Sequence, residues 1–348
     1  MDQIVKEDIS GILKFQINWD KLKDKTVLVT GATGMIGQYL VMSLLELNKK
    51  YNSNIQILAL CRNREKGMDL FKEFFEDHEL KLIVQDVTTE IDLKEPVGFV
   101  FHTASPANPK FYSTDPVGTI LANTIGTKNA LEVARINNAK FCYISTMEVY
   151  GEMQEVSEIK ETEFGAINPL ESRSCYPESK RLGENLCVAY HEQYGVDIRI
   201  IRPAYTYGPG MSINDSRVQC EFMRKVIRDE NIVMKSDGSL RRTYTYVADV
   251  ISGIFMAVLN GEDIVYNVAD AKALISIRQL AETIIASKPG SNSKLEIKIK
   301  TEKGWSSIAP KIMDCSRLKS LGWQPMYKTD EGIHRAVIYN LRKEKEHE

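Results

Sequence analysis

The chain has 348 residues, of which 43% are hydrophobic, and its formal charge at pH 7 is −2 with acidic and basic residues interspersed. This composition allows one large or two modest domains with a sizeable core, and it gives no reason to expect nucleic acid or a membrane as a partner. The six cysteines include no Cys-x-x-Cys pair, so we expect free thiols and no metal site. The N-terminus is too acidic for a signal peptide, and no apolar run approaches the ~20 residues of a membrane span. We therefore expect a soluble cytoplasmic protein.

Residues 1–25 precede the first predicted strand. Their apolar residues suggest a short amphipathic segment that either packs on the domain or forms an oligomer contact; these residues are Ile9, Ile12, Leu13, Phe15 and Trp19.

A glycine-rich turn follows the first strand, which we expect at 27–29, and opens a helix. Strand, glycine turn and helix in this order form a cradle for phosphates. Gly31 permits the tight turn, Gly34 lets the backbone approach a pyrophosphate, and Gly37 lets the helix pack closely against the strand. The N–H groups at the start of the helix then attract the phosphates. We therefore expect a dinucleotide to contact Gly31, Thr33, Gly34, Met35, Ile36 and Gly37.

The second predicted strand, 55–60, is followed by Arg62 and Arg64. In a dinucleotide-binding fold the end of this strand meets the adenosine ribose, where an acidic residue would select NAD. A guanidinium instead suits the 2′-phosphate of NADP. We therefore expect NADP as the cofactor and keep NAD as the alternative. In the alternative interpretation, both arginines are solvated loop residues that do not contact the cofactor.

The next two strands place further residues at the cofactor. The strand 80–84 is followed by Asp86 and Val87, and Asp86 either meets the adenine amino group or caps a turn. The strand 97–101 ends in small residues, including Ala104, that let the backbone approach a cofactor. We expect His102 to be structural.

A long helix is predicted from Pro116, with Asp115 as its cap, to about Asn137. Asn123 lies in the middle of this helix, and a polar residue there is often simply a surface residue. By itself this position carries little weight, but we include Asn123 among the residues expected to contact the cofactor.

The fifth predicted strand, 141–144, runs into a polar stretch, and a later helix carries a tyrosine–lysine pair. Tyr176 and Lys180 are four residues apart and share one face of the helix expected up to about Tyr194. Such a pair often occurs by chance on a surface, but after a dinucleotide motif and a strand that ends in Ser145-Thr146 it indicates a functional site.

Strict alternation of strand and helix stops after a sixth strand at 197–202. We expect an α/β fold, a Rossmann-type doubly wound parallel sheet with a smaller C-terminal α+β substrate-binding region. The NAD(P)-binding domain would comprise 1–201, with 243–260 returning to it, and the substrate-binding region would comprise 202–242 and 261–348. A capping box at Ser276 and Gln279 begins one helix there, and 329–344 forms the last.

These motifs resemble the extended short-chain dehydrogenases/reductases that act on nucleotide sugars, over nearly all of 24–325. The markers are Thr30–Gly37, Asp86-Val87, Tyr176-x-x-x-Lys180, Arg202-Pro203, Tyr207-Gly208-Pro209 and Leu321–Pro325. The middle of the chain is most similar to UDP-glucuronate decarboxylases, in the runs 102–107, 123–127, 145–151 and 173–176.

The resemblance implies a role for each residue of the site. Tyr176 would exchange a proton with a sugar hydroxyl or ketone at C4, and Lys180 would hold the nicotinamide ribose and favour tyrosinate by its charge. Thr146 would hydrogen-bond the reacting oxygen, and Glu148 would serve a second proton transfer or orient the sugar. The substrate would further contact Ser105, Tyr205, Arg242 and, as a weaker candidate, Arg217.

Three departures from the family pattern bear on the reaction. The decarboxylases carry serine where this chain has Met147, asparagine where it has Tyr205, and aspartate where it has Arg62. A methionine cannot exchange a proton, which argues against dehydration and weakens decarboxylation. Three hypotheses stay open: a redox-neutral decarboxylase or epimerase acting through a 4-keto intermediate, an NADPH-dependent 4-keto-sugar reductase, and a non-catalytic NADP-binding redox sensor. A homodimer is expected in each case.

Overall fold

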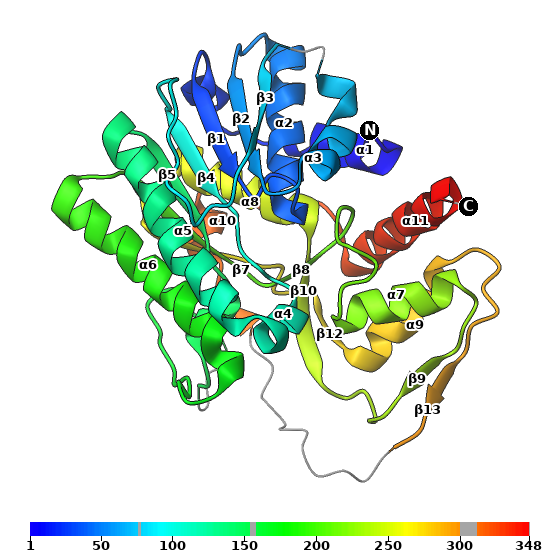
Figure 1. The fold of residues 1–348 in the computed structure, drawn as a ribbon. Helices are drawn as coiled ribbons and strands as arrows, with labels where there is room; N and C mark the ends of the chain where they lie inside the picture. The colour runs from blue at the N-terminus through cyan, green and yellow to red at the C-terminus, as the bar shows by residue number, and fades with distance from the viewer. Residues whose placement is uncertain (76–77, 154–157, 300–311, 348) are drawn as a thin grey trace.

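A computed structural model describes residues 1–75, 78–153, 158–299 and 312–347 (Figure 1). Its centre is a seven-stranded sheet in the order β11-β7-β5-β4-β1-β2-β3, in which every neighbouring pair is parallel. The strands are β1 (Thr26–Thr30), β2 (Gln56–Cys61), β3 (Leu80–Val84), β4 (Phe99–His102), β5 (Lys140–Ile144), β7 (Ile198–Pro203) and β11 (Val265–Val268). This is the doubly wound order, so the predicted fold class is confirmed.

Helices cover both faces of the sheet, as parallel strands require. One face carries α1 (Gln3–Ile12), α2 (Met35–Tyr51) and α8 (Val247–Asn260), which share a core with Val27 and Val29 of β1. The opposite face carries α5 (Pro116–Asn137) and α6 (Cys175–Tyr194), which pack on Leu28. Figure 1 shows these two long helices side by side. The N-terminal segment therefore packs on the domain, through the buried face of α1.

Smaller elements follow the central strands and build the rest of the chain. Three short strands form a second sheet: β8 (Tyr205–Tyr207), β10 (Arg241–Tyr246) and β12 (Leu274–Ser276). Two further pairs join β9 (Ile232–Met234) to β13 (Leu295–Ile297) and β6 (Glu158–Ile159) to β14 (Ile312–Met313). The remaining helices are α3 (Arg64–Leu70), α4 (Pro109–Thr114), α7 (Val218–Ile227), α9 (Ile277–Ser287), α10 (Ser316–Ser320) and α11 (Thr329–His347), with 3-10 turns η1 (Trp19–Leu22), η2 (Lys72–Phe74), η3 (Met147–Tyr150) and η4 (Ser172–Ser174).

The structure differs from the sequence-based expectation around β10 and β11. The helix in 243–260 does return to the central sheet as α8, but the strand before it pairs with β8 and β12. The sheet instead gains β11, which lies in the segment expected to bind the sugar and pairs with β7. A helix that crosses over a parallel sheet delivers the next strand to that sheet's edge, and α8 does so for β11. The capping box at Ser276 is confirmed.

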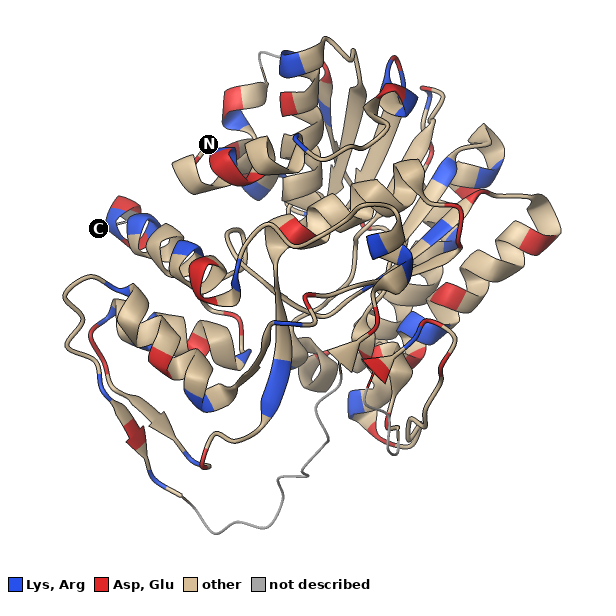
Figure 2. Ribbon diagram, turned by 180° about the vertical axis from the view of Figure 1, so that it is seen from behind, with Lys and Arg blue, Asp and Glu red and all other residues tan. Residues whose placement is uncertain are grey.

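Basic and acidic residues are spread along the chain with both signs mixed, as the ribbon in Figure 2 shows in a view turned by 180° from Figure 1. Among the described residues, no helix has the length and apolar character that crossing a membrane demands.

Candidate active site

The glycine-rich turn lies where β1 ends, beside β4, at the point where the strand order reverses. Gly31 has φ +67°, a conformation that favours glycine. A Cβ on Gly37 would lie 2.3 Å from the carbonyl oxygen of Gly31, so only glycine fits there. Because the N-cap of α2 is Gly34, no side chain of its own caps the first turn, and the N–H groups of this turn are left for a phosphate. The cradle therefore fits a dinucleotide.

The end of β2 brings Arg62 close to Asp86. Their Nη1 and Oδ2 atoms are 3.8 Å apart, and the Arg62 side chain is 73% exposed. Asp86 Oδ1 accepts hydrogen bonds from the N–H and hydroxyl of Thr88. Partial burial opposes ionisation of Asp86, but these hydrogen bonds and the Arg62 charge outweigh it and lower its pKa. Val87 points away into the core, where it packs against Gly126 of α5.

The loop after β4 lies against the glycine turn. A Cβ on Gly31 would lie 2.7 Å from the Cα of Ala104, so the two backbones are in contact. The hydroxyl oxygen of Ser105 is buried and has no hydrogen-bond partner among the described residues, which leaves it for a ligand. His102 bonds Thr30 and Thr127 inside the core.

Asn123 is fully buried, and so is not the surface residue that its position allows. Its amide nitrogen donates to Ser179 Oγ at 3.0 Å, which ties α5 to α6 one residue before Lys180. Its Oδ1 atom has no partner in the part of the chain that the structure describes.

Tyr176, Thr146 and Glu148 meet at the carboxyl ends of the central strands. Thr146 ends the loop after β5 and caps η3 by accepting from the N–H of Glu148 at 3.2 Å. Tyr176 lies in the first turn of α6, and the Thr146 side chain lowers its pKa. Lys180, one turn further on, is buried; its Nζ donates to the carbonyl of Ile144 at 2.7 Å.

The electrostatics of this group favour the neutral phenol. Burial raises the pKa of Tyr176 to about 12 and Glu148 adds to the effect, whereas the Thr146 hydrogen bond and the Arg217 charge lower it. Burial also lowers the pKa of Lys180 to about 7, against the opposing charge of Glu184. The cation that lowers the pKa of Tyr176 here is thus Arg217, not Lys180.

The expected substrate residues line the same region. The Arg242 guanidinium lies 4.8 Å from the centre of the Tyr205 ring. Burial raises the pKa of Tyr205, and the charges that act on it are those of Arg242, Glu148 and Arg173. Arg217 is held by Asp215 through two hydrogen bonds of 2.9 and 2.8 Å, so its charge is partly neutralised.

Two residues at the site were not predicted. Tyr112 of α4 stacks on the ring of Tyr176, and Arg173 of η4 forms an ion pair with Glu148 at 2.7 Å. Arg173 belongs to a run that matches the decarboxylases, which was a usable signal, whereas no pattern in the sequence points to Tyr112.

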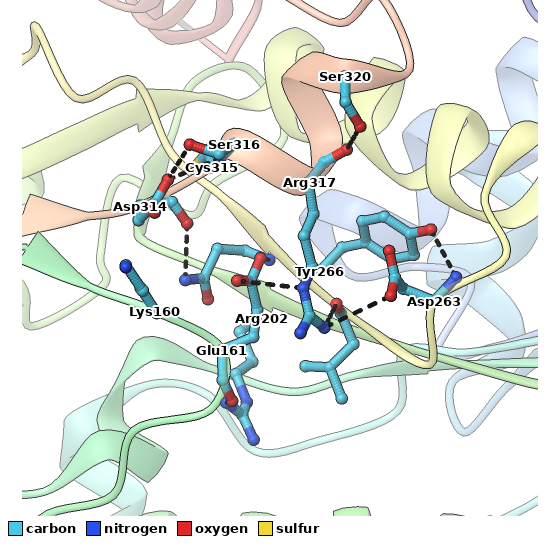
Figure 3. A network of polar contacts seen from close by, with 12 residues as sticks. Lys160, Glu161, Arg202, Asp263, Tyr266, Asp314, Cys315, Ser316, Arg317 and Ser320 are labelled. Atoms are coloured by element: carbon cyan, nitrogen blue, oxygen red, sulfur yellow. Dashed lines mark hydrogen bonds and ion pairs between the residues drawn. The ribbon is translucent and has the colours of Figure 1, made fainter.

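Buried polar contacts anchor α6 to the strand β7. Arg202 donates to both carboxylate oxygens of Glu184, at 2.9 and 2.6 Å, and to the hydroxyl of Tyr150 at 3.0 Å. It also donates to the carbonyl of Glu161, whose carboxylate lies 3.7 Å from the guanidinium of Arg317. Figure 3 shows Arg202 and Glu161 together below Arg317. This network links the end of β7 to α6, and so fixes the helix that carries Tyr176 and Lys180.

Met147 belongs to an apolar cluster beside the site. Its side chain is buried and packs in a group with Tyr150, Ile159, Ala204, Ala269, Met313 and Cys315. The polar groups on either side of it in the chain, Thr146 and Glu148, are the ones that act on Tyr176.

A dinucleotide cradle at the switch point of a doubly wound sheet, beside a buried tyrosine with a lysine one turn on, defines an oxidoreductase-type site. Within the described ranges, no three His, Cys, Asp or Glu side chains are grouped to hold a metal. The chain belongs to the NAD dependent epimerase/dehydratase family, whose model matches residues 27–269. This confirms the resemblance drawn from the motifs.

Relatives and solved structures agree with this family. UDP-glucuronic acid decarboxylase 5 of Arabidopsis thaliana is 34% identical over 309 residues, which cover 88% of this chain and 86% of the relative. UDP-glucuronic acid decarboxylase 1 of Xenopus tropicalis is 31% identical over 93% of this chain and 74% of its own length. UDP-glucuronic acid 4-epimerase from Bacillus cereus, solved with UDP-glucuronic acid and NAD, shares the fold with a TM-score of 0.76 and 23% identity, over 91% of this chain and 99% of its own.

Proposed function

We propose that this protein is an NAD(P)-dependent enzyme that modifies a nucleotide sugar through a 4-keto intermediate, without net oxidation. The observation that carries the proposal is the meeting of Tyr176, Thr146 and Glu148 beside the dinucleotide cradle. When bound there, a nicotinamide supplies reversible hydride transfer.

The residues of the chain handle the proton and the orientation of the sugar. Tyr176 takes the proton of the C4 hydroxyl and later returns it, and Thr146 holds the same oxygen by a hydrogen bond. We expect Lys180, one turn from Tyr176 in α6, to hold the nicotinamide ribose.

A UDP-hexuronate is the substrate class that we favour. The relatives at 31–34% identity named above are UDP-glucuronic acid decarboxylases. A hexuronate with a ketone at C4 is a β-keto acid, which loses carbon dioxide readily. Arg242 would then seat the carboxylate, and with a neutral sugar it would serve the diphosphate. Met147 offers no proton, so we expect no loss of water.

The test is incubation with UDP-glucuronate and either NAD or NADP, followed by mass spectrometry of the nucleotide sugars. Loss of mass equal to carbon dioxide, with catalytic cofactor, supports decarboxylation, and an unchanged mass with altered chromatography supports epimerisation. Turnover only of neutral 4-keto sugars with NADPH would replace the proposal by a reductase. Cofactor binding without turnover of any nucleotide sugar would replace it by a redox sensor. Loss of water would contradict the argument from Met147.

Tyr176→Phe is the matched variant for this assay because it removes only the hydroxyl. The cofactor should still bind, and turnover should fall by ~10² or more, the scale of general acid–base catalysis. Near-normal turnover would remove Tyr176 from the role.

We infer that the cofactor is NADP, because the side chain of Arg62 is exposed at the position where the decarboxylases carry an aspartate. Its guanidinium Nη1 lies 3.8 Å from Asp86 Oδ2, which leaves it accessible to a 2′-phosphate. Titration of both cofactors by fluorescence tests this. Arg62→Ala should weaken NADP binding by roughly 10- to 150-fold and leave NAD binding nearly unchanged, since a charge-assisted bond is worth roughly 1.5–3 kcal/mol. Arg135→Ala, an exposed arginine on α5, is the control. Tighter binding of NAD would overturn the inference.

We also propose a homodimer that uses the outer faces of α5 and α6. Apolar side chains are exposed along these helices at Val117, Ile120, Leu121, Ile125 and Leu182. A second copy of the same face would bury this row, as an isologous contact does. Light scattering should give twice the chain mass, and Leu121→Asp should give the single mass, whereas Met68→Asp on α3 should not.

Six buried, free cysteines further suit a reducing compartment, and we place the protein in the cytoplasm.

A further inference from the structure

The catalytic tyrosine is covered by a second tyrosine. The rings of Tyr112 and Tyr176 are stacked, with centroids 4.6 Å apart and an angle of 15° between their planes. Both residues are buried, at 2% and 7% exposure, so Tyr112 keeps water from this face of Tyr176. The hydroxyl of Tyr112 donates to the carbonyl of Ala107 at 3.0 Å, and the Tyr112 carbonyl accepts from the thiol of Cys175 at 3.7 Å. These two contacts hold Tyr112 between the loop before α4 and the first residue of α6.

An arginine extends this arrangement to Glu148. The Arg173 guanidinium lies 4.8 Å from the centre of the Tyr112 ring, within the range of a cation–π contact. The same guanidinium donates to Glu148 Oε2 at 2.7 Å. Tyr112, Glu148 and Arg173 come from α4, η3 and η4, three segments that are distant in the sequence and meet at Tyr176.

The charges around Tyr176 give the pair a function. After burial, the carboxylate of Glu148 is the strongest influence that keeps the phenol neutral. Arg217 acts in the opposite direction, but Asp215 holds it through two hydrogen bonds. Lys180 donates to a carbonyl instead of to Tyr176. Arg173 is paired with Glu148 at 2.7 Å, so its positive charge offsets part of the negative charge that opposes formation of tyrosinate.

We propose that Arg173 and Tyr112 are positioning residues for the catalytic tyrosine. Arg173 neutralises Glu148 beside the phenol, and the ring of Tyr112 holds Tyr176 in place and excludes water. The inference rests on the proposed function, in which Tyr176 is the acid and base, and its test includes a measurement that needs no substrate.

The first measurement is the titration of Tyr176 itself. The chain is produced with fluorinated tyrosine, whose phenol is more acidic, so that titration falls where the protein stays folded. The fluorine signal of Tyr176 is assigned by its loss in Tyr176→Phe. Arg173→Gln should raise the titration midpoint by about one pH unit, because the opposing charge of Glu148 is no longer paired. Arg173→Lys should keep most of the original midpoint, and Arg173→Gln combined with Glu148→Gln should restore it. Arg135→Gln is the control.

The second measurement is the pH profile of turnover with the substrate identified above. Arg173→Gln should move the acidic limb of kcat to higher pH by the same amount. Tyr112→Leu should lower kcat about tenfold with KM within about twofold, because the phenol loses its fixed orientation. Tyr112→Phe keeps the ring and should retain more than half of kcat.

The outcomes separate the two proposals. A raised midpoint in Arg173→Gln without turnover of any nucleotide sugar would sink the proposed function and leave this inference standing. Turnover with a midpoint unchanged in Arg173→Gln would overturn the role of Arg173. Equal losses in Tyr112→Phe and Tyr112→Leu, or a loss in KM alone, would overturn the role of the Tyr112 ring.

Discussion

Breaking the buried ion pair between Arg202 and Glu184 should be among the most damaging single changes outside the reacting groups. The two side chains are 3% and 11% exposed, and two hydrogen bonds join them. Arg202→Met removes the cation and leaves the Glu184 carboxylate buried, with the hydroxyl of Ser145 as a remaining donor at 2.5 Å. Removing one partner of such a pair costs roughly 3–5 kcal/mol, because the other charge is left uncompensated.

The expected shift in melting temperature follows from the size of the chain. At about 2 cal/mol/K of unfolding entropy per residue, a chain of this length should lose about 4–7 °C for that cost. Urea unfolding followed by circular dichroism measures the free energy, and calorimetry measures the temperature. The exposed pair Lys72–Asp69 gives a control: Lys72→Met should cost no more than ~0.5 kcal/mol.

A double variant tests the reasoning itself. Arg202→Met combined with Glu184→Leu removes both charges together, so it should be more stable than the sum of the two single losses by ~2 kcal/mol or more. A single-variant cost below ~1 kcal/mol, or strict additivity in the double variant, would refute the claim that an uncompensated buried charge causes the loss.

Three further changes have definite expected outcomes. Burial raises the pKa of Asp249 to about 7. Its contribution to stability is therefore complete below the ordinary carboxyl pKa of about 4 and is lost as pH rises through 7. In urea titrations, the fall in unfolding free energy between pH 5 and 8 should be smaller by ~3 kcal/mol in Asp249→Asn than in the original chain. Gly37→Ala should weaken cofactor binding at least ~10-fold by fluorescence, since its Cβ meets the Gly31 carbonyl, whereas Gly98→Ala meets a flexible lysine and should not. Asp8→Ala should cost ~3–5 kcal/mol in urea unfolding, because it strips Tyr39, Tyr246 and Arg335 of their shared acceptor; a cost below ~1 kcal/mol would contradict this.

The fold was predictable because its signals are local. A short apolar strand, three glycines and a helical pattern lie within one stretch of chain, and the carboxyl ends of parallel strands meet at one edge. That edge brings Thr146 and Tyr176 together. The edge strand β11 was missed because four residues, Val265–Val268, carry no periodic pattern, and only the path of α8 over the sheet delivers them to β7.

Contacts between segments that are distant in the chain could not be predicted from the sequence. Asn123 looks like a surface residue of a helix until α6 covers that face and Ser179 bonds it. The stacking of Tyr112 on Tyr176 joins residues that are far apart in the chain and share no spacing rule. Such contacts depend on tertiary packing, which periodicity does not encode.

The geometry of η3 also changes how Met147 bears on the reaction. Met147 and Glu148 are the first two residues of this 3-10 turn, in which successive side chains point about 120° apart, so they cannot both face one point. Thr146 and Glu148 act on Tyr176, and Met147 packs into the apolar cluster with Cys315 and Met313 instead. Met147, which has no exchangeable proton, therefore lies in an apolar cluster, while Thr146 and Glu148 on either side of it act on the phenol of Tyr176. Compared with the decarboxylase pattern, Met147 lacks a hydroxyl, but it leaves Tyr176, Thr146 and Glu148 in place for the proton transfer that we propose.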